Sequence, residues 1–397
     1  MECACRPGLL KGPTDLFDTL ATVLFWAAFG IMLYHWVAFP VMLWLWGKVS
    51  PRRYRPESRT EPFRVSVVMA VYNEEEIMAE KMKNLLGADY PPDKMEVLIG
   101  SDSSTDRTDD IIRSFNDPRV RLIHYNQQAG KTVVQNRLLA EARGDIILCT
   151  DADSILTPAS LRLMLENMRD PKVAVVNPRY ARVNKNGSAA ESLYDRWEAK
   201  VKELEGRLGA MVGCNAYANM IRREVADPIP DDTNLDDFVL GIRPFRRGYD
   251  VVTEPRALVV TQTETEKLEF RRKARISRGN LQVLSRFADL LLPKYGVKAW
   301  VYFSHKVLRM LVPFLLLAML VTSAVESSRP FFAAMLGLQL IVLFSVPLLV
   351  VARGRWRKLL VPQYYYFVNI ALLVGYWEFF ASHEKYWTKT PRNPTIL

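Results

Sequence analysis

The chain has 397 residues but only four cysteines, and no two of them form a Cys-x-x-Cys pair. Closely spaced cysteines are the usual sign of zinc and redox sites, so the sequence predicts neither. Cys149 lies in an apolar run and is expected to be a small core residue. Internal repeats and low-complexity segments are also lacking, so we expect ordinary domains, of which this length could hold two or three.

Acidic and basic side chains are absent from residues 20–46, and three later apolar runs are nearly as long, at 307–325, 330–352 and 359–380. A helix of about 20 apolar residues crosses the hydrocarbon core of a bilayer. These runs predict an integral, multi-pass membrane protein, and the first run is too long for a cleaved signal peptide. The last run contains Glu378, and it could span the membrane, re-enter it or lie at its interface.

Basic residues flank the membrane runs unequally. They are concentrated after the first run and in the loop 353–358, whereas the loop 326–329 is nearly neutral. Positive loops stay in the cytoplasm, so we expect residues 50–306 on the cytoplasmic side of the plasma (inner) membrane. If 359–380 spans, the C-terminal tail lies outside, but its basic residues favour the inside. The two indications conflict.

The net charge of +10 does not indicate a nucleic-acid partner. Much of the basic excess lies beside the membrane runs, where anionic lipid headgroups account for it. Paired charges within the runs and half-repeats are lacking, which disfavours a transporter. The partner that this pattern predicts is the lipid bilayer.

The middle of the chain alternates short apolar segments with helical ones. Strands are predicted at 65–71, 96–100, 119–125 and 145–150, and helices at 106–115, 131–142 and 159–168. A further helix, after the first strand, is expected to begin with Asn73 as its cap. This order predicts an α/β fold with a mostly parallel sheet, and ligands of such sheets bind beyond the carboxyl ends of the strands.

Polar clusters follow three of the predicted strands, at 72–73, 101–106 and 151–153. Because these strand ends lie at one edge of a parallel sheet, the clusters should converge on one crevice. Asp151 and Asp153 point to the same side of an extended segment and can hold a divalent cation against a diphosphate. The expected cofactor is Mg²⁺ or Mn²⁺.

Lys131 follows a glycine at the start of a predicted helix, but Tyr125 stands where a phosphate loop requires its first glycine. Lys131 can reach a phosphate or be a surface lysine. Asp236 and Asp237 form a second acidic pair that could supply a general base or merely start a helix. The basic cluster around Arg275 could clamp a diphosphate or touch lipid headgroups.

The order of these motifs resembles membrane-embedded family 2 glycosyltransferases of GT-A fold. The motifs run from 71–74 through 101–106, 130–131, 151–153 and 236–237 to an arginine-rich segment. Similar proteins include the synthases of cellulose, chitin, hyaluronan and poly-N-acetylglucosamine. The resemblance covers about 60–285 by motif, and it is specific for the superfamily rather than for the sugar.

The resemblance implies a role for each matching residue. Uridine would be bound by Ala70, Tyr72 and Glu74, and the uracil ring by Asp102. Asp153, in preference to Asp151, would be the direct metal ligand, and Asp237 would be the catalytic base beside Asp236. The other residues expected to bind the donor diphosphate are Lys131, Asp151, Arg275 and Arg278. Ile276 stands where processive synthases have an acceptor-stacking tryptophan, which puts repeated addition in doubt.

We therefore predict an inverting transferase that moves a sugar from a UDP-sugar to a hydroxyl acceptor, saccharide or lipid-linked, most simply in the synthesis of a β-linked polysaccharide. The alternatives are transfer of one sugar to a polyprenyl or other lipid, and an inactive nucleotide-sensing scaffold. The predicted regions are an N-terminal membrane helix with its basic flank, a GT-A catalytic domain, an arginine-rich interface segment and a C-terminal membrane region, at 1–55, 56–270, 271–306 and 307–397.

Overall fold

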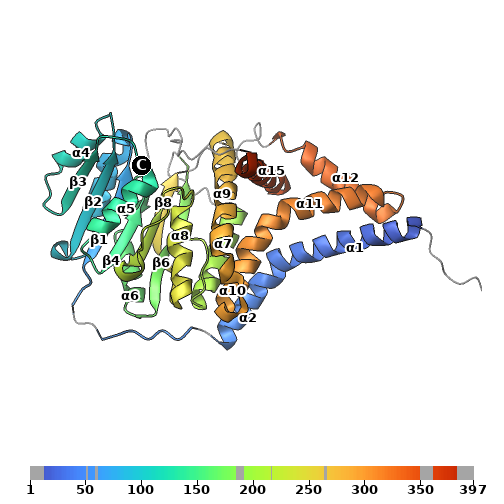
Figure 1. Cartoon of the computed structure of the whole chain (residues 1–397), viewed down its shortest axis with the longest axis horizontal. Coiled ribbons are helices and arrows are strands. Elements are labelled where there is room, and N and C mark those ends of the chain that lie inside the picture. The colour runs from blue at the N-terminus through green and yellow to red at the C-terminus, as the bar shows by residue number, and fades with distance from the viewer. Residues whose placement is uncertain are drawn as a thin grey trace, which may run out of the picture.

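A computed structural model describes residues 13–50, 52–58, 61–184, 192–215, 217–262, 266–348 and 361–381. An α/β domain lies at one end of the long axis, and apolar helices extend from it toward the other end (Figure 1). The predicted basic loop at 353–358, the C-terminal tail and the first two cysteines lie outside the described residues.

The domain is built on an eight-stranded sheet of order β3-β2-β1-β4-β7-β6-β8-β5. Its strands are β1 (Val65–Val71), β2 (Met95–Asp102), β3 (Val120–Tyr125), β4 (Ile146–Thr150), β5 (Ile155–Leu156), β6 (Val173–Val183), β7 (Ala218–Arg222) and β8 (Asp250–Gln262). The four strands from β3 to β4 are parallel, as predicted. The other half is mixed, because β7 runs antiparallel to both β4 and β6.

Helices cover both faces of the sheet. They are α3 (Glu75–Leu86), α4 (Thr108–Ser114), α5 (Lys131–Glu141), α6 (Ser160–Met168), α7 (Leu193–Arg207) and α8 (Asp236–Ile242). Side chains alternate along a strand, so Val67 and Met69 of β1 pack in the core beneath α3 and α6, whereas Val68 packs in the core beneath α5 and α7. The second core continues to Phe39 and Tyr302 at the base of the apolar helices.

The predicted cap of the first domain helix is wrong. Asn73 has a φ of 52°, and α3 begins after it, at Glu75. Asparagine tolerates this left-handed conformation, and the Asn73 side-chain oxygen accepts a hydrogen bond from the backbone N–H of Thr105 at 2.7 Å. Asn73 therefore joins the loops after β1 and β2 instead of capping a helix.

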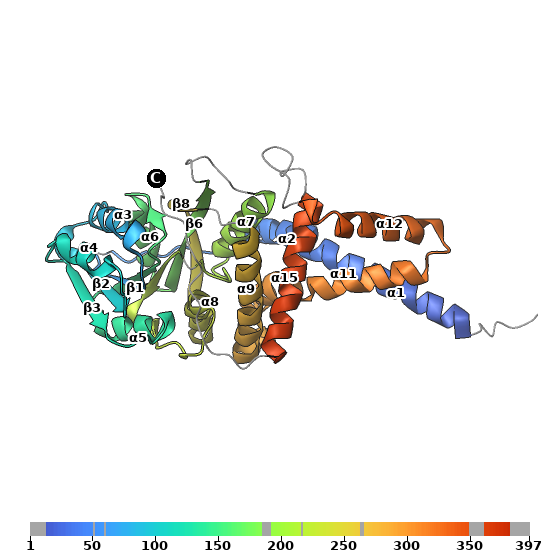
Figure 2. The same ribbon diagram turned by 90° about the horizontal axis from the view of Figure 1, so that it is seen from above.

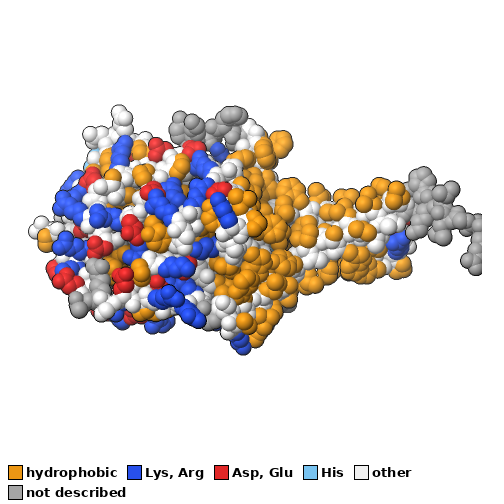
Figure 3. Space-filling model, turned by 60° about the horizontal axis from the view of Figure 1, so that its bottom comes forward, with side chains coloured by type: hydrophobic (Ala, Val, Ile, Leu, Met, Phe, Trp, Pro, Cys, Tyr) orange, Lys and Arg blue, Asp and Glu red, His pale blue; other side chains and the backbone are white. Residues whose placement is uncertain are grey.

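Hydrophobic side chains cover much of the visible face of the bundle that is formed by the apolar helices (Figure 3). They comprise α1 (Pro13–Leu33), α2 (Phe39–Val49), α10 (Val297–Val301), α11 (Leu308–Val325) and α12 (Pro330–Phe344), with π-helical turns η1 (Tyr34–Ala38) and η7 (Tyr302–Val307). Within the described residues, two continuous helices, Leu16–Val49 and Val297–Val325, have the length and composition to cross a membrane, and α12 is shorter.

Two further helices lie between the domain and the bundle. They are α9 (Glu266–Phe287) and α15 (Val361–Ala381), and they run side by side across the long axis, whereas α1, α11 and α12 run along it (Figure 2). Ser277 of α9 donates a hydrogen bond to the Leu372 carbonyl of α15 at 2.8 Å. These two helices therefore form a transverse layer at the base of the bundle.

Arg52 fastens the segment after α2 to the domain. Its guanidinium lies 2.5 Å from Asp170 and 2.9 Å from Asp250, and all three side chains are nearly buried. We expect Arg52→Ala to lower the free energy of unfolding by about 3 kcal/mol, because it leaves two buried carboxylates short of a partner. The measurement is denaturant unfolding in detergent. Arg107→Ala, which removes an exposed pair with Glu75, should cost less than about 1 kcal/mol; equal losses would contradict the prediction.

Candidate active site

The polar segments after β1 and β2 meet, as predicted for the ends of parallel strands. The backbone N–H of Asn73 donates to the Ser104 hydroxyl at 3.1 Å, and that of Glu74 donates to the Thr108 hydroxyl at 2.7 Å. Tyr72 lies in the same turn and is half-buried. These bonds fix the turn that carries Tyr72 and Glu74, whose uridine contacts remain a prediction.

Lys131 connects the two acidic pairs. Its Nζ lies 3.0 Å from Asp151 Oδ1 and 3.1 Å from Asp236 Oδ2. Burial alone would lower the pKa of the ammonium, but Asp151, Asp236 and Asp237 raise it above its ordinary value. Lys131 is therefore a half-buried, ion-paired side chain rather than a solvated surface lysine, and its contact with a phosphate stays a prediction. The structure places its charge between carboxylates that are more than 80 residues apart in the chain.

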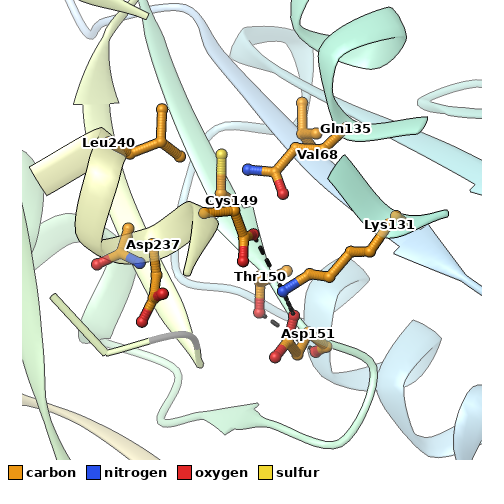
Figure 4. Close-up of a pocket in the computed structure, with 11 residues that line it drawn as sticks. Val68, Lys131, Gln135, Cys149, Thr150, Asp151, Asp237 and Leu240 are labelled. Carbon is orange, nitrogen blue, oxygen red and sulfur yellow. Dashed lines mark hydrogen bonds and ion pairs between the residues drawn. The ribbon is translucent and has the colours of Figure 1, made fainter. Parts of the chain in front are cut away.

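One pocket gathers these groups at the carboxyl ends of β1 and β4 (Figure 4). Its lining residues are Val68, Ala70, Lys131, Gln135, Cys149, Thr150, Asp151, Asn219, Asp236, Asp237 and Leu240. Asp237 lies on one side of the pocket, and Lys131 reaches in from the other side to contact Asp151 (Figure 4). Gln135 and Asn219 were not among the predicted site residues, because single amides carry no motif.

Asp237 has an altered ionisation. Burial and the neighbouring Asp236 raise its pKa to about 7, while Lys131 acts in the opposite direction. A carboxylate whose pKa lies near the working pH can accept a proton and release it again. Asp237 is thus suited to act as a general base.

Asp102 has an internal role. It is buried, and its two carboxylate oxygens accept hydrogen bonds from the backbone N–H groups of Ala129 and Gly130, at 2.7 and 2.9 Å. Gly130 has a φ of 92°, which favours glycine, and α5 begins at the next residue. Asp102 therefore positions Lys131, and its predicted contact with a uracil ring remains a prediction.

Lys81 supports the Asp151–Asp153 turn through hydrogen bonds to the residues on either side of it, and it was not among the predicted site residues. It is fully buried, and its Nζ donates to the Ser154 carbonyl at 2.6 Å and to the Thr150 hydroxyl at 2.9 Å. Burial lowers its pKa to about 7. The sequence could have indicated this role, because Lys81 lies between Met78 and Leu85 on the apolar face of α3. Lysine there indicates a polar partner inside the domain.

The donor set fits a hard cation. Within the described ranges, no group of three or more histidine, cysteine, aspartate or glutamate side chains could hold a metal ion by itself. However, Mg²⁺ and similar ions are commonly bound by one or two carboxylates together with substrate phosphates and water. Asp151 lines the pocket, and Asp153 lies two residues further on but outside the pocket lining. Both provide oxygen donors of this kind, so the turn fits a cation that arrives with a nucleotide diphosphate, and Asp153 as the direct ligand stays a prediction.

Arg275 and Arg278 lie on α9, outside the residues that line the pocket. Arg275 is exposed and Arg278 half-buried, and their contact with a diphosphate stays a prediction. The same helix holds the segment before α8. Gln282 accepts a hydrogen bond from the Asn234 N–H at 3.0 Å, and Arg286 donates to the Thr233 hydroxyl at 2.9 Å. α9 therefore positions Asp236 and Asp237.

Known proteins to which the chain is similar include several glycosyltransferases. Residues 66–229 match the profile of Glycosyl transferase family 2. The chain is 30% identical over 254 residues to probable glycosyltransferase YdaM of Bacillus subtilis, with 58% of each chain covered. It is 26% identical to beta-monoglucosyldiacylglycerol synthase of Nostoc, over 51% of this chain and 45% of that one.

Similarity to poly-beta-1,6-N-acetyl-D-glucosamine synthase of Staphylococcus aureus is 24% identity over 56% of each chain. The chain thus spans about half the length of the curated relatives it matches. Among solved structures, mannosyltransferase PcManGT from Pyrobaculum calidifontis, in complex with GDP-Man and Mn²⁺, superposes with a TM-score of 0.69 at 21% identity, covering 92% of this chain and 99% of that one. That likeness confirms the GT-A fold.

Lys131→Met should destabilise the domain by about 2–4 kcal/mol, because Asp151, Asp236 and Asp237 lose the charge between them. Mn²⁺ at millimolar concentration should restore part of the loss, since a cation can replace the ammonium between the carboxylates. Thermal unfolding with and without Mn²⁺ measures both effects. Lys83→Met, on the exposed side of α3, is the control and should change neither value. A Lys131→Met protein as stable as wild type would contradict the bridging role.

Proposed function

We propose that the chain, whose residues 66–229 match the profile of Glycosyl transferase family 2, transfers a sugar from a UDP-sugar to a hydroxyl acceptor at a membrane surface, with inversion at the anomeric carbon. The observation that carries this proposal is the shared pocket of Asp151, at the end of β4, and Asp237, at the start of α8. A donor diphosphate at Asp151 and an acceptor hydroxyl at Asp237 would lie on opposite sides of one sugar.

Asp237 takes the proton of the attacking hydroxyl as the new bond forms, and its raised pKa makes it a base of suitable strength. A divalent cation bound to Asp151 and Asp153 would neutralise the charge that develops on the departing diphosphate. Lys131 keeps the carboxylates of Asp151 and Asp236 in place before the substrates bind. Inversion of an α-linked donor yields a β-linked product.

Residue 276 supports addition of a single sugar to an acceptor that stays in the membrane. Ile276 stands where the resemblance to processive synthases places an acceptor-stacking tryptophan, so one basis for repeated addition is missing. The similarity to beta-monoglucosyldiacylglycerol synthase favours the same acceptor class. The second candidate is polysaccharide synthesis, which the similarity to the poly-N-acetylglucosamine synthase favours.

The bundle supports a membrane arrangement in which α1, α11 and α12 span and α15 lies in the interface. α15 runs across the bundle beside α9, and its tyrosines and Trp377 are residues typical of membrane interfaces (Figure 2). A helix in this orientation does not change sides. The conflict over the C-terminal tail then disappears, because the tail stays on the side of the catalytic domain.

Asp237→Asn should reduce transfer at least 1,000-fold and leave Mn²⁺-dependent UDP binding unchanged, because it removes a base but no donor contact. Asp153→Ala should instead weaken that binding about tenfold. Detergent-purified protein is incubated with Mn²⁺, membrane lipid extract and a panel of UDP-sugars plus GDP-mannose, and nucleotide release and product size are measured. A product one sugar larger than the acceptor is expected, whereas a polymer would favour the second candidate.

Asp110→Asn, on the exposed surface of α4, is the matched control and should retain full activity. Asp237→Asn with wild-type turnover would remove Asp237 from the role of base. Wild-type protein that binds no nucleotide in the presence of Mn²⁺ would overturn the proposed function itself.

The placement of α15 is tested by cysteine labelling in sealed vesicles of known orientation, in a background without Cys3 and Cys5. Val361→Cys and Phe380→Cys, at the two ends of the helix, should both react with a membrane-impermeant maleimide from the catalytic-domain side. Ser328→Cys, in the loop between α11 and α12, should react only from the opposite side. Labelling of Val361→Cys and Phe380→Cys from different sides would show that α15 spans.

A further inference from the structure

One carboxylate at the base of the bundle is surrounded by cations. Glu198 of α7 lies 2.7 Å from Arg309 Nη1, 3.4 Å from Lys306 Nζ and 3.8 Å from Lys202 Nζ. It also accepts a hydrogen bond from the Tyr194 hydroxyl at 3.0 Å. A single carboxylate does not require three cations for its neutralisation.

Lys273 of α9 extends this group. The Tyr194 ring centroid lies 4.8 Å from Arg309 Cζ and 5.4 Å from Lys273 Nζ. Burial, together with the positive charges of Arg272 and Arg182, lowers the pKa of Lys273 to about 8. We name Lys202, Lys273, Lys306 and Arg309 the interface cation cluster.

The neighbouring carboxylates do not balance the cluster. Glu205 is engaged by His305 Nδ1 at 2.6 Å and by the Val212 N–H at 3.2 Å. Asp195 and Glu269 each lie 3.7 Å from Arg182. With Arg182 included, five cations face four carboxylates within the part of the chain that the structure describes. Burial of surplus charge is costly unless an anion completes the group.

A single backbone segment lies between the interface cation cluster and the pocket that contains Asp237. Lys202 Nζ donates to Asn215 Oδ1 at 2.6 Å, and a Cβ on Gly213 would come within 2.6 Å of Lys306 Nζ. Asn219, which lines the active-site pocket, donates to the Asn215 carbonyl at 2.6 Å. The segment 213–215 therefore separates the cluster from the pocket that contains Asp237.

On its other side the cluster meets the bundle. Arg309 is in the first turn of α11, which is apolar from Met310 to Val321. His35 of η1 bonds the Ser304 carbonyl of η7 at 2.8 Å. Trp36 donates to the Tyr365 hydroxyl at 3.1 Å, which places aromatic side chains typical of membrane interfaces at this level. A headgroup at this level would have its chains beside α11.

We propose that the interface cation cluster binds the phosphate group of a membrane lipid that carries the acceptor hydroxyl. The inference rests on the proposed function and names its acceptor class. Lys306 and Arg309 would donate charge-assisted hydrogen bonds to phosphate oxygens. Because 213–215 stands between the cluster and Asp237, the phosphate is the anchor of the lipid and the attacked oxygen belongs to another part of it.

The test uses the full chain in neutral-lipid nanodiscs. The probes are two lipids with both a phosphate and a free hydroxyl, namely phosphatidylglycerol and a sugar linked to a polyprenol through diphosphate, and their phosphate-free counterparts, diacylglycerol and the sugar linked directly to the polyprenol. Binding is followed by native mass spectrometry. We expect a phosphate lipid to bind at least tenfold more tightly than its phosphate-free counterpart, and Arg309→Gln and Lys306→Gln should each reduce that affinity about tenfold without changing the binding of the counterpart. The lipid bound in this way should gain one sugar when Mn²⁺ and the UDP-sugars are added. Equal affinity within both pairs, or a bound lipid that gains no sugar, would overturn the proposal.

Arg309→Gln leaves Glu198 in contact with Lys306, Lys202 and His305, so the variant should fold. Arg309→Lys, which keeps the charge, should recover most of the affinity. Arg246→Gln removes an exposed arginine that pairs with Asp289 and is the matched control. Arg309→Gln that loses thermal stability but keeps full phosphate affinity would show that the cluster only neutralises Glu198. Mn²⁺-dependent UDP binding, measured alongside, separates this failure from failure of the proposed function.

Discussion

The arrangement of the site depends on the contact of the Lys131 ammonium with Asp151 and Asp236. These carboxylates belong to the end of β4 and the start of α8, and without a cation between them they would repel each other in a half-buried pocket. The position of Lys131 is set in turn by Asp102, which holds the two backbone N–H groups before α5. A residue of the second strand thus influences the spacing between the turn that begins at Asp151 and the start of α8. Such a chain of contacts can prepare the pocket before the nucleotide arrives.

Those parts of the domain that depend on residues close together in the chain were predicted from the sequence. β1 was predicted with its observed bounds because apolar side chains fill both faces of a buried strand. Asn73 was wrongly assigned as a helix cap, because its side chain is used by Thr105, more than 30 residues away. The mixed half of the sheet was not predicted either. The position of β7 between β4 and β6 follows from packing of the whole domain. The pattern of apolar and polar residues within β7 does not indicate which strands are its neighbours.

The candidate site shows the same division. Asp151, Asp236 and Asp237 were found because acidic pairs at element ends are visible in the sequence, and the pocket brings them together. Their connection through Lys131 was not predictable, since sequence spacing says nothing of which charges meet in space. Lys81 was missed for a related reason. A buried lysine on an apolar helix face is readable only when its partners, here the Ser154 carbonyl and the Thr150 hydroxyl, are known.

The transverse layer of α9 and α15 connects the candidate active site with the apolar bundle. α9 holds the segment before Asp237 through Gln282 and contacts α15 so closely that a Cβ on Gly375 would lie 2.2 Å from the Ala274 carbonyl oxygen. If α15 lies in the interface, one rigid helix pair fixes the height of the base above the membrane. On the proposed function, an acceptor hydroxyl carried by a lipid at that height would meet Asp237 without leaving the bilayer. The entropic cost of bringing acceptor and enzyme together would then be smaller, because the acceptor searches a surface instead of a volume.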